Sequence, residues 1–319
     1  MRLMMTALAV CVGVTAASAT EYSCPQIRLV VPFASASPGD IAARMVAERL
    51  NVRMKRNVVI ENHGGATGNI GTKLVVDAAP DGCTLLLNVT AIATFPMSFV
   101  NLRYNPFEDL TPVGGIGRAP TLLLAPPSLL ADDIKSLVAL SKQRFDGLTY
   151  SVADYGLQPH LAVEQLKHRT GAHFVIVPYK GSGAALADLV AARVDFGSFP
   201  VGTAGKALIE ERRLKALAVV QDRRTSVMPD VPSTAEQGFP GLFGGTQYAV
   251  FAPAATPKEI VGLLGDDLRE VIGEPIVRQR FLTIGFEPTQ MSSEEVAAAM
   301  EKIAGAMAAP IKRLNIRHD

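Results

Sequence analysis

The sequence of 319 residues contains no tryptophan, few other aromatic residues and almost no net charge. Lysine and arginine together number 31 and aspartate and glutamate 30, which gives a formal charge of +1. Proteins that bind nucleic acids usually need a basic excess that displaces counterions from the phosphates. The composition therefore argues against a nucleic-acid partner.

Long apolar stretches are also missing beyond the N-terminus, where no segment has the roughly 18 consecutive apolar residues of a membrane-spanning helix. The N-terminus itself, MRLMMTALAVCVGVTAASA, combines the basic Arg2, an apolar stretch and a small-residue cleavage site at 17–19. This pattern is typical of a secretory signal peptide over residues 1–19. A lipoprotein signal ending at Cys11 is disfavoured because valine precedes that cysteine. We expect an exported, periplasmic protein.

Motifs for catalysis are absent or incomplete. There is no G-x-S-x-G elbow, and KGSGA at 180–184 lacks that spacing. GGATGNIGTK at 64–73 differs from a P-loop in its glycine spacing and lacks Gly-Lys-Ser/Thr. His160, Glu164 and His168 follow one another at intervals of four, which suits either three metal ligands on one helix or an ordinary solvated face. The sequence predicts no metal, no cofactor and no enzymatic activity.

Only two cysteines, Cys24 and Cys83, remain once the signal peptide is removed. Each stands just before an apolar segment, IRLVVPF and TLLLNV. If these segments are parallel neighbouring strands, the cysteines lie at the same end of the sheet and a disulfide is possible in an oxidising compartment. The alternative is two separate buried thiols.

Short apolar segments alternate with amphipathic ones along most of the chain. The expected strands are 27–33, 57–61, 84–89, 112–117, 121–125, 148–153, 174–178, 194–198, 215–220 and 247–252. The expected helices include 40–54, 69–78, 133–143, 158–170, 182–191, 203–210, 257–272, 274–282 and 293–308. This alternation predicts an α/β protein with mainly parallel sheets covered on both faces.

The length favours two domains, and no Ser/Gly-rich linker separates them. We therefore expect the chain to pass between domains in short extended segments. The best candidates are 120–128 and 246–257, which are apolar and end in prolines.

The segment LVVPFASASPGD at 29–40 joins an expected strand to an expected helix through small residues. Backbone N–H groups at such a turn can hold an anion, and the helix N-terminus favours negative charge there. Asp40 could cap the helix. The same pattern also fits a strand-to-helix turn that binds nothing.

Eight stretches occur in the order that is found in one known family. They are IRLVVPFA, NVVIENHGGATGNIGT, AAPDGCTLLL, YNPFEDLTPVGGI, GLTYSVADYG, VPYKGSGAALADLVAARVD, MPDVPSTAEQGFPG and FAPAATP. Through them the chain resembles the Bug family, the periplasmic solute-binding receptors of tripartite tricarboxylate transporters. The resemblance implies a two-lobed, type II-like periplasmic-binding-protein fold that closes on a small organic acid without catalysis. It also implies a monomeric receptor whose partner is a membrane permease of one small and one large subunit.

The resemblance further implies a first lobe of residues 20–121 and 250–319 and a second lobe of 122–249, hinged near 120–126 and 246–253. It makes the strands after Cys24 and Cys83 neighbours, which supports the disulfide. The ligand-binding residues carried over from the family are Phe33, Ser35, Ala36, Ser37, Asp40, Asn69, Thr90, Ala91, Asp154, Tyr155, His160, Tyr179, Lys180, Gly181 and Thr203.

Three departures from the family pattern predict a changed pocket. The tandem glycines of the first loop are replaced within 35–37 by Ser-Ala-Ser, and Gln247-Tyr248 stands where the family has tryptophan. Asp154 follows the strand at 148–153, where the family has uncharged residues. If Asp154 faces the cleft, repulsion disfavours a plain dicarboxylate and favours an amino acid, a cationic ligand or an aromatic acid stacked on Tyr155. The alternative is that Asp154 points to solvent.

Two other functions fit parts of the same sequence. A binding protein of this kind could feed a signalling partner as a ligand sensor instead of supplying a permease. A periplasmic enzyme on a two-lobed scaffold is less favoured, because no nucleophile with a base and no metal set emerges from the sequence.

Overall fold

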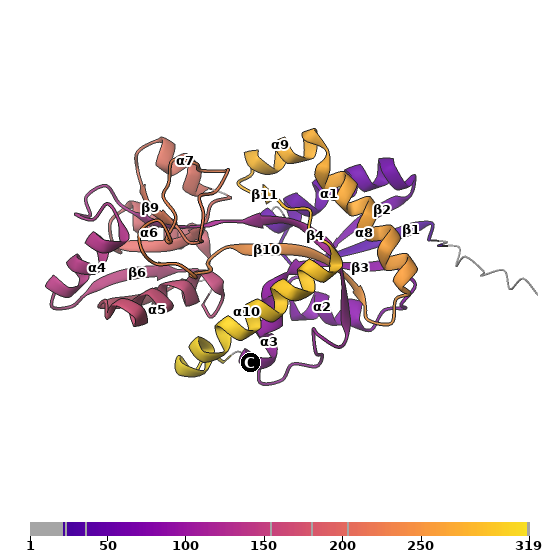
Figure 1. Ribbon diagram of the computed structural model, residues 1–319, viewed down its shortest axis with the longest axis horizontal. Coiled ribbons are helices and arrows are strands. Elements are labelled where there is room, and N and C mark those ends of the chain that lie inside the picture. Colours follow the sequence, from indigo (N-terminus) through magenta and orange to yellow (C-terminus); the bar gives the residue numbers. More distant parts are fainter. Residues whose placement is uncertain are drawn as a thin grey trace, which may run out of the picture.

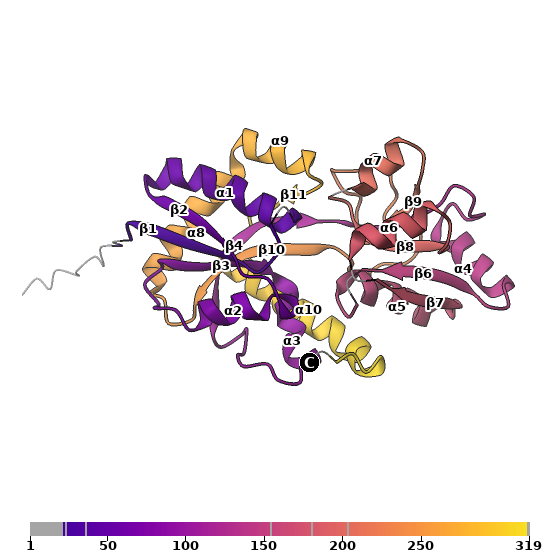
Figure 2. The ribbon, with the colours of Figure 1, turned by 180° about the vertical axis from the view of Figure 1, so that it is seen from behind.

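The strands of the protein form two separate sheets, one of six strands and one of five. The computed structural model describes residues 22, 24–35, 37–153, 155–179, 181–202 and 204–317. Figures 1 and 2 show the two sheets side by side, in two lobes joined by strand segments in the middle of the molecule. We call the part built on the six-stranded sheet the first lobe and the part built on the five-stranded sheet the second lobe. The predicted two-lobed α/β fold is confirmed.

The first sheet has the strand order β11-β4-β10-β3-β1-β2 and the second the order β7-β6-β8-β5-β9. The strands of the first sheet are β1 (Gln26–Val31), β2 (Asn57–Asn62), β3 (Thr84–Val89), β4 (Leu110–Ala119), β10 (Thr246–Pro253) and β11 (Glu287–Pro288). Those of the second are β5 (Thr121–Ala125), β6 (Leu148–Val152), β7 (Phe174–Pro178), β8 (Phe196–Pro200) and β9 (Lys215–Val219).

Helices cover both faces of each sheet. They are α1 (Pro38–Met54), α2 (Asn69–Val76), α3 (Phe95–Ser98), α4 (Ile134–Gln143), α5 (Gln158–Thr170), α6 (Ser182–Val190), α7 (Ala204–Glu210), α8 (Lys258–Gly273), α9 (Pro275–Thr283) and α10 (Ser293–Arg313), with short 3₁₀ turns η1 (Ala66–Gly68) and η2 (Thr90–Thr94). In the first lobe α1, α8 and α9 pack on one face of the sheet and α2, α3 and α10 on the other. In the second, α4 and α5 cover one face and α6 and α7 the other. Burial on both faces explains why β3 and β5 are nearly continuous apolar runs.

The expectation of mainly parallel sheets needs correction. β1 pairs in parallel with β2 and β3, and β6 with β7 and β8. The other five pairings of the described strands are antiparallel, and all of them involve β10, β4 or β5. These are the strands that lie next to the passages between the lobes. No helix lies between β4 and β5 or between β9 and β10, all of which the structure describes, so the crossover helix that imposes parallel pairing is missing at these points.

The lobes are connected at two points that lie against each other. Only Pro120 separates β4 from β5, so the chain changes sheets within one residue. On the return, Gly244 and Gly245 precede β10, and the Thr121 hydroxyl donates to the Gly244 carbonyl over 2.5 Å. β10 pairs with β4 from Thr246 onwards. The lobe boundaries at 121/122 and 249/250 stay a prediction.

A disulfide joins Cys24 to Cys83, with their Cα atoms 5.6 Å apart. The two cysteines precede β1 and β3, which pair in parallel with Arg28 opposite Thr84. Because parallel neighbours start at the same edge of a sheet, the cysteines lie within bonding reach. The bond ties the first strand of the first lobe to the strand beside it.

The last helix, α10, spans the underside of the molecule in the view of Figure 1. Ser292 and Glu295 form a capping box at its start, with the Ser292 hydroxyl accepting from the Glu295 N–H over 3.2 Å. α10 packs against η2 and α3 in the first lobe and against α5 in the second. In the described part of the chain, no helix has both the length and the apolar character needed to cross a membrane.

Candidate ligand-binding cleft

A cavity of about 450 Å³ lies between the lobes. It is lined by Pro32, Phe33, Ala34 and Ser37 after β1, by Gly64, Gly65, Thr67 and Gly68 before α2, by Val89, Ala91 and Phe95 after β3, by Leu157, Gln158 and Pro159 at the start of α5, and by Pro200, Thr246 and Tyr248. Most of these residues follow the carboxyl end of a strand, which is where open α/β sheets bind ligands. None of the described lining residues carries a charged side chain.

Three helices direct their N-termini at this cavity. Ser37 is the N-cap of α1, Gly68 of α2 and Leu157 of α5, and all three residues line the cavity. The unpaired N–H groups and the dipole of a helix N-terminus favour an anion. Two of these helices belong to the first lobe and α5 to the second. An anionic ligand between them therefore meets favourable electrostatics from both lobes.

The loop before α2 has an unusual backbone. Its backbone φ angles are positive at four successive residues: 112° at Gly65, 46° at Ala66, 55° at Thr67 and 90° at Gly68. Residues with a Cβ rarely adopt positive φ, and a β-branched threonine least of all. Strained backbone of this kind persists where the surrounding structure holds it, and it concentrates at ligand sites.

Buried side chains behind the loop hold it in place. The Gly68 carbonyl accepts a 2.9 Å hydrogen bond from the Thr72 hydroxyl, which in turn accepts one of 2.9 Å from the Asn88 amide. Thr72 and Asn88 are both almost fully buried. The chain Asn88–Thr72–Gly68 thus links β3 to the wall of the cavity and fixes the loop without an external partner.

An aromatic wall forms another side of the cavity. The Phe33 and Tyr248 rings meet edge to face, and Tyr248 packs in turn on Phe286 with centroids 5.0 Å apart. A Cβ at position 39 would lie 2.7 Å from the Phe33 ring, so Gly39 leaves the space that this ring occupies. Phe286 belongs to the core of the first lobe, which makes the wall rigid.

Comparison with known proteins identifies the chain. The family described as "Tripartite tricarboxylate transporter family receptor" matches residues 42–316. The chain belongs to this receptor family. BugT of Bordetella pertussis is 33% identical over 303 residues, which cover 93% of this chain and 89% of BugT.

Solved structures show the same fold. Rpa4515 of R. palustris, solved with adipate, is 32% identical, with a TM-score of 0.79 over 92% of this chain and 98% of that one. The periplasmic binding protein BugD is 29% identical, with a TM-score of 0.76 over 92% of this chain and 99% of that one. BugD is a periplasmic binding protein, and the matched family is a receptor family.

In the receptor, the first predicted loop contributes only some of its residues to the cleft. Phe33 and Ser37 line it, whereas the Ser35 hydroxyl donates to Asn62 at the surface. Asp40 is 1% exposed and accepts from the Asn62 amide over 2.8 Å and from Arg44 over 3.0 Å. Asp40 therefore holds the loop to β2. The sequence offered Asp40 as the N-cap of α1, but the N-cap is Ser37.

Of the residues predicted at the start of α2 and after β3, namely Asn69, Thr90 and Ala91, only Ala91 lines the cleft. The side-chain oxygen Oδ1 of Asn69 accepts from the Tyr104 hydroxyl over 2.6 Å, in a separate surface hollow. Ala91 lines the cleft, but Thr90 is fully buried behind it and its hydroxyl has no hydrogen-bond partner among the described residues. The strained glycine loop before Asn69, rather than Asn69 itself, faces the cleft.

In the fourth predicted loop, residues 152–160, the named residues Tyr155 and His160 pack on each other and are not among the described lining residues. The Tyr155 ring stacks on the His160 ring at 4.7 Å, and His160 Nδ1 accepts from the Gly156 N–H over 3.0 Å. Burial lowers the pKa of His160 to about 4, which keeps the imidazole neutral. The same loop lines the cleft through three residues that the sequence interpretation did not name: Leu157, Gln158 and Pro159.

Neither interpretation of the His160–Glu164–His168 spacing describes the structure. His160 and Glu164 are 2% and 6% exposed, so this part of α5 is not a solvated face. Glu164 accepts a 2.5 Å hydrogen bond from the buried Tyr150 hydroxyl. Among the described residues, no group of three or more His, Cys, Asp or Glu side chains is placed to hold a metal ion.

After β7, the predicted residues Tyr179 and Gly181 are not among the described lining residues of the cleft. The Tyr179 hydroxyl donates to Asp188 over 2.8 Å, and Gly181 is the N-cap of α6. Four other predicted ligand-binding residues lie outside the described residues: Ala36, Asp154, Lys180 and Thr203. Their roles, like the ligand contacts of Phe33, Ser37 and Ala91, stay predictions.

One lining residue that the sequence interpretation missed has an unsatisfied polar group. Gln158 is 3% exposed, and its Oε1 has no hydrogen-bond partner among the described residues. A buried carbonyl oxygen without a partner costs free energy, so such groups are rare in native proteins. A ligand with a hydroxyl or amine group could provide the missing donor.

Proposed function

We propose that the receptor captures a small carboxylic acid in the periplasm and delivers it, as a monomer, to the two-subunit membrane permease of a tripartite tricarboxylate transporter. The observation that carries the proposal is the cleft itself, where the N-termini of α1, α2 and α5 meet without an opposing charge among the described lining residues. The adipate bound to the relative Rpa4515 supports a carboxylate. The relative BugD and the predicted signal peptide support the periplasm.

The carboxylate would be bound by N–H groups and hydroxyls rather than by a cationic side chain. Ser37 and Thr67 carry hydroxyls in the lining, and the loop 64–68 brings backbone groups close because three of its five residues are glycines. The aromatic wall of Phe33 and Tyr248 would pack on the carbon skeleton of the acid. The volume of about 450 Å³ suits a metabolite rather than a polymer.

Binding would bring the lobes together. In the described part of the chain, the passages between the lobes at Pro120 and at Gly244 before β10 lie side by side and can act as one hinge. Because α5 carries its N-terminus on the second lobe, closure would bring that terminus to a ligand already seated on α1 and α2. Closure would also remove the ligand from water, which strengthens each electrostatic contact.

Thermal unfolding of the purified protein with a panel of ligands tests this proposal. The panel contains succinate, malate, adipate, glutamate and benzoate, together with succinamide and adipamide as uncharged controls. A ligand at about 100 times its dissociation constant should stabilise the protein by about 2.7 kcal/mol. We expect at least one acid to raise the melting temperature while its amide does not. Equal shifts with acids and amides, or no shift with any acid, would contradict a carboxylate receptor.

A further inference from the structure

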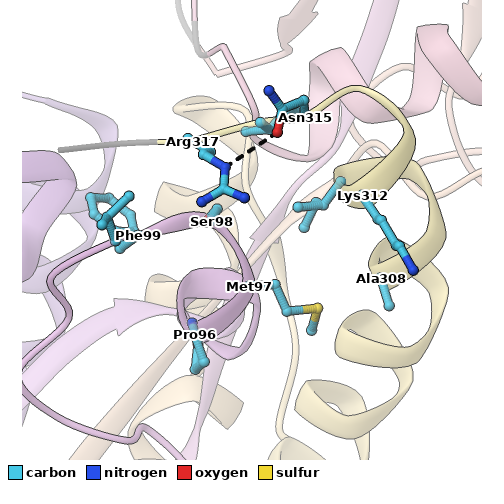
Figure 3. Close-up of a pocket in the computed structure, with 11 residues that line it drawn as sticks. Pro96, Met97, Ser98, Phe99, Ala308, Lys312, Asn315 and Arg317 are labelled. Atoms are coloured by element: carbon cyan, nitrogen blue, oxygen red, sulfur yellow. Dashed lines mark hydrogen bonds between the residues drawn. The ribbon is translucent and has the colours of Figure 1, made fainter.

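A second hollow, of about 560 Å³, lies outside the cleft between α3 and the end of α10. Figure 3 shows Pro96 and Met97 on one side, Ala308 and Lys312 on the other, and Arg317 above them. We call it the α3–α10 groove; the rest of its lining is Ser98, Phe99, Val100, Ile311, Asn315 and Ile316. It shares no lining residue with the ligand cleft.

Apolar side chains are exposed at the groove and beyond it on the same segment. Met97 and Val100 are 38% and 56% exposed, and Ile70 and Phe107 of the adjoining surface are 58% and 45% exposed. The surface hollow that contains Asn69 and Ile70 is a different one, and it is also lined by residues 101–104, which follow Val100. Exposed apolar side chains that gather around concave surface mark interaction sites rather than ordinary solvent-facing surface.

The groove also carries positive charge that no acidic side chain of the described residues neutralises in an ion pair. Lys312, Arg313 and Arg317 make no ion pair within the described residues, and the only polar contact of Arg317 is from its Nε to Asn315 over 3.2 Å. Lys312 and Arg313 lie in the last turn of α10, where positive charge also suits the helix dipole. Arg317 lies beyond that turn, so the helix dipole alone does not account for it. The charge complements an acidic partner.

The groove is in direct contact with the lobe that moves. Ile311 and Ile316 line it, and both pack with Leu161 of α5. Four residues before Leu161, α5 begins with the residues that line the ligand cleft. A change in the position of α5 on closure would therefore be transmitted through Leu161 to the wall of the groove.

We propose that the α3–α10 groove is the docking site for an acidic segment with apolar side chains on the periplasmic face of the permease. The proposal rests on the proposed function, since it needs a permease to which the ligand is delivered. The groove is concave and shares no lining residue with the cleft, and a concave surface fits a protruding protein segment better than the flat surface of a bilayer. Contact with α5 gives the permease a way to distinguish the closed receptor from the open one.

Two sets of variants test the docking site in cells that express the receptor and its permease. The first is the double charge reversal Lys312→Glu with Arg317→Glu. Its control is Lys135→Glu with Lys142→Glu on α4 of the second lobe, where both lysines are exposed and make no ion pair with a described residue. The measurement is the initial uptake rate of the labelled acid that gives the largest thermal shift in the panel. We expect uptake to fall about tenfold in the groove variant and to stay normal in the control.

The thermal shift of each purified variant is measured alongside. The acid should stabilise the groove variant as it does the wild type, which separates docking from ligand binding. Unchanged uptake in the groove variant would overturn the docking site. If no acid stabilises the wild type, the proposed function fails, and docking is then tested by crosslinking alone.

Crosslinking needs no knowledge of the ligand. A photoreactive benzoylphenylalanine replaces Val100 in the groove or, as the control, Phe145, which is 96% exposed on the second lobe. Crosslinks from position 100 to a permease subunit, absent from position 145, would support the groove. Crosslinks from position 100 to lipid alone, or to no permease subunit, would overturn it.

Discussion

The rings of Phe33 and Tyr248 meet edge to face with their centroids 5.8 Å apart and their planes at 67°. Phe33 follows β1, Tyr248 belongs to β10, and β3 lies between these two strands in the sheet. The two residues are far apart in the sequence, yet together they form the aromatic wall of the ligand cleft. Their meeting depends on a small residue between them.

Gly39 provides that space, and replacing it should disturb the cleft. A methyl group there would lie 2.7 Å from Phe33 Cδ2 and 3.0 Å from Tyr248 Cε1. We expect Gly39→Ala to lower the free energy of unfolding by about 1–3 kcal/mol, the usual cost of overpacking. The thermal shift given by the bound acid should shrink as well. Gly262→Ala in α8 is the control, because its methyl group would meet nothing within 4 Å. Urea unfolding measures the stability of both variants, and equal stabilities would refute the role of Gly39.

Gln158 should affect ligand choice more than stability. Gln158→Leu removes a buried polar group that has no partner among the described residues, so we expect unfolding free energy to stay equal or rise slightly. Affinity for acids with a hydroxyl or amino group should fall about tenfold or more relative to the same acids without it. Calorimetric titration of malate against succinate measures this. If the Gln158 amide instead donates to a second carboxylate of the ligand, the affinities for malate and succinate would fall together, which would contradict an acceptor role. Gln143→Leu, at an exposed position of α4, is the control.

The disulfide should contribute a large part of the stability of the first lobe. Cys24 and Cys83 are separated by 59 residues, and closing a loop of that size stabilises a protein by about 4 kcal/mol in the chain-entropy treatment. The double variant Cys24→Ser with Cys83→Ser should therefore unfold at clearly lower urea concentration. Non-reducing peptide mapping should recover the two cysteine peptides as one species. Free thiols at both positions in protein purified from the periplasm would refute the bond.

His160 should make the protein less stable in mild acid. Burial lowers the folded-state pKa of His160 from its ordinary 6.5 to about 4. Between these values the unfolded chain binds a proton that the folded protein does not, so stability is full above pH 6.5 and falls as the pH drops towards 4. The loss is on the order of 3 kcal/mol for a shift of this size. Melting temperatures of His160→Gln should fall less steeply over this range, whereas His168→Gln, exposed on the same helix, should follow the wild type.

The positions of strands and helices follow from local pattern. Uninterrupted apolar runs such as 85–87 predicted buried strands, and the last helix, expected from residue 293, begins at Ser293. Parallel order was inferred from strand–helix alternation and failed for β10, β4 and β5, because the chain passes from β4 to β5 and from β9 to β10 without a crossover helix. The position of Cys24 and Cys83 before two strands allowed a disulfide, but only strand order could decide it.

The sequence by itself determined the class of fold and the family, and it singled out the segment 29–40 as a candidate anion site. It could do so because the spacing of hydrophobic residues, the positions of small residues and the order of motifs can all be read directly along the chain. Only the tertiary structure decided which side chains face the ligand. Asp40, Asn69 and His160 stand on the right elements, but their polar groups are used by Asn62, Tyr104 and Gly156 within the protein. Those partners come from other turns and elements of the fold, and no spacing along the chain records them.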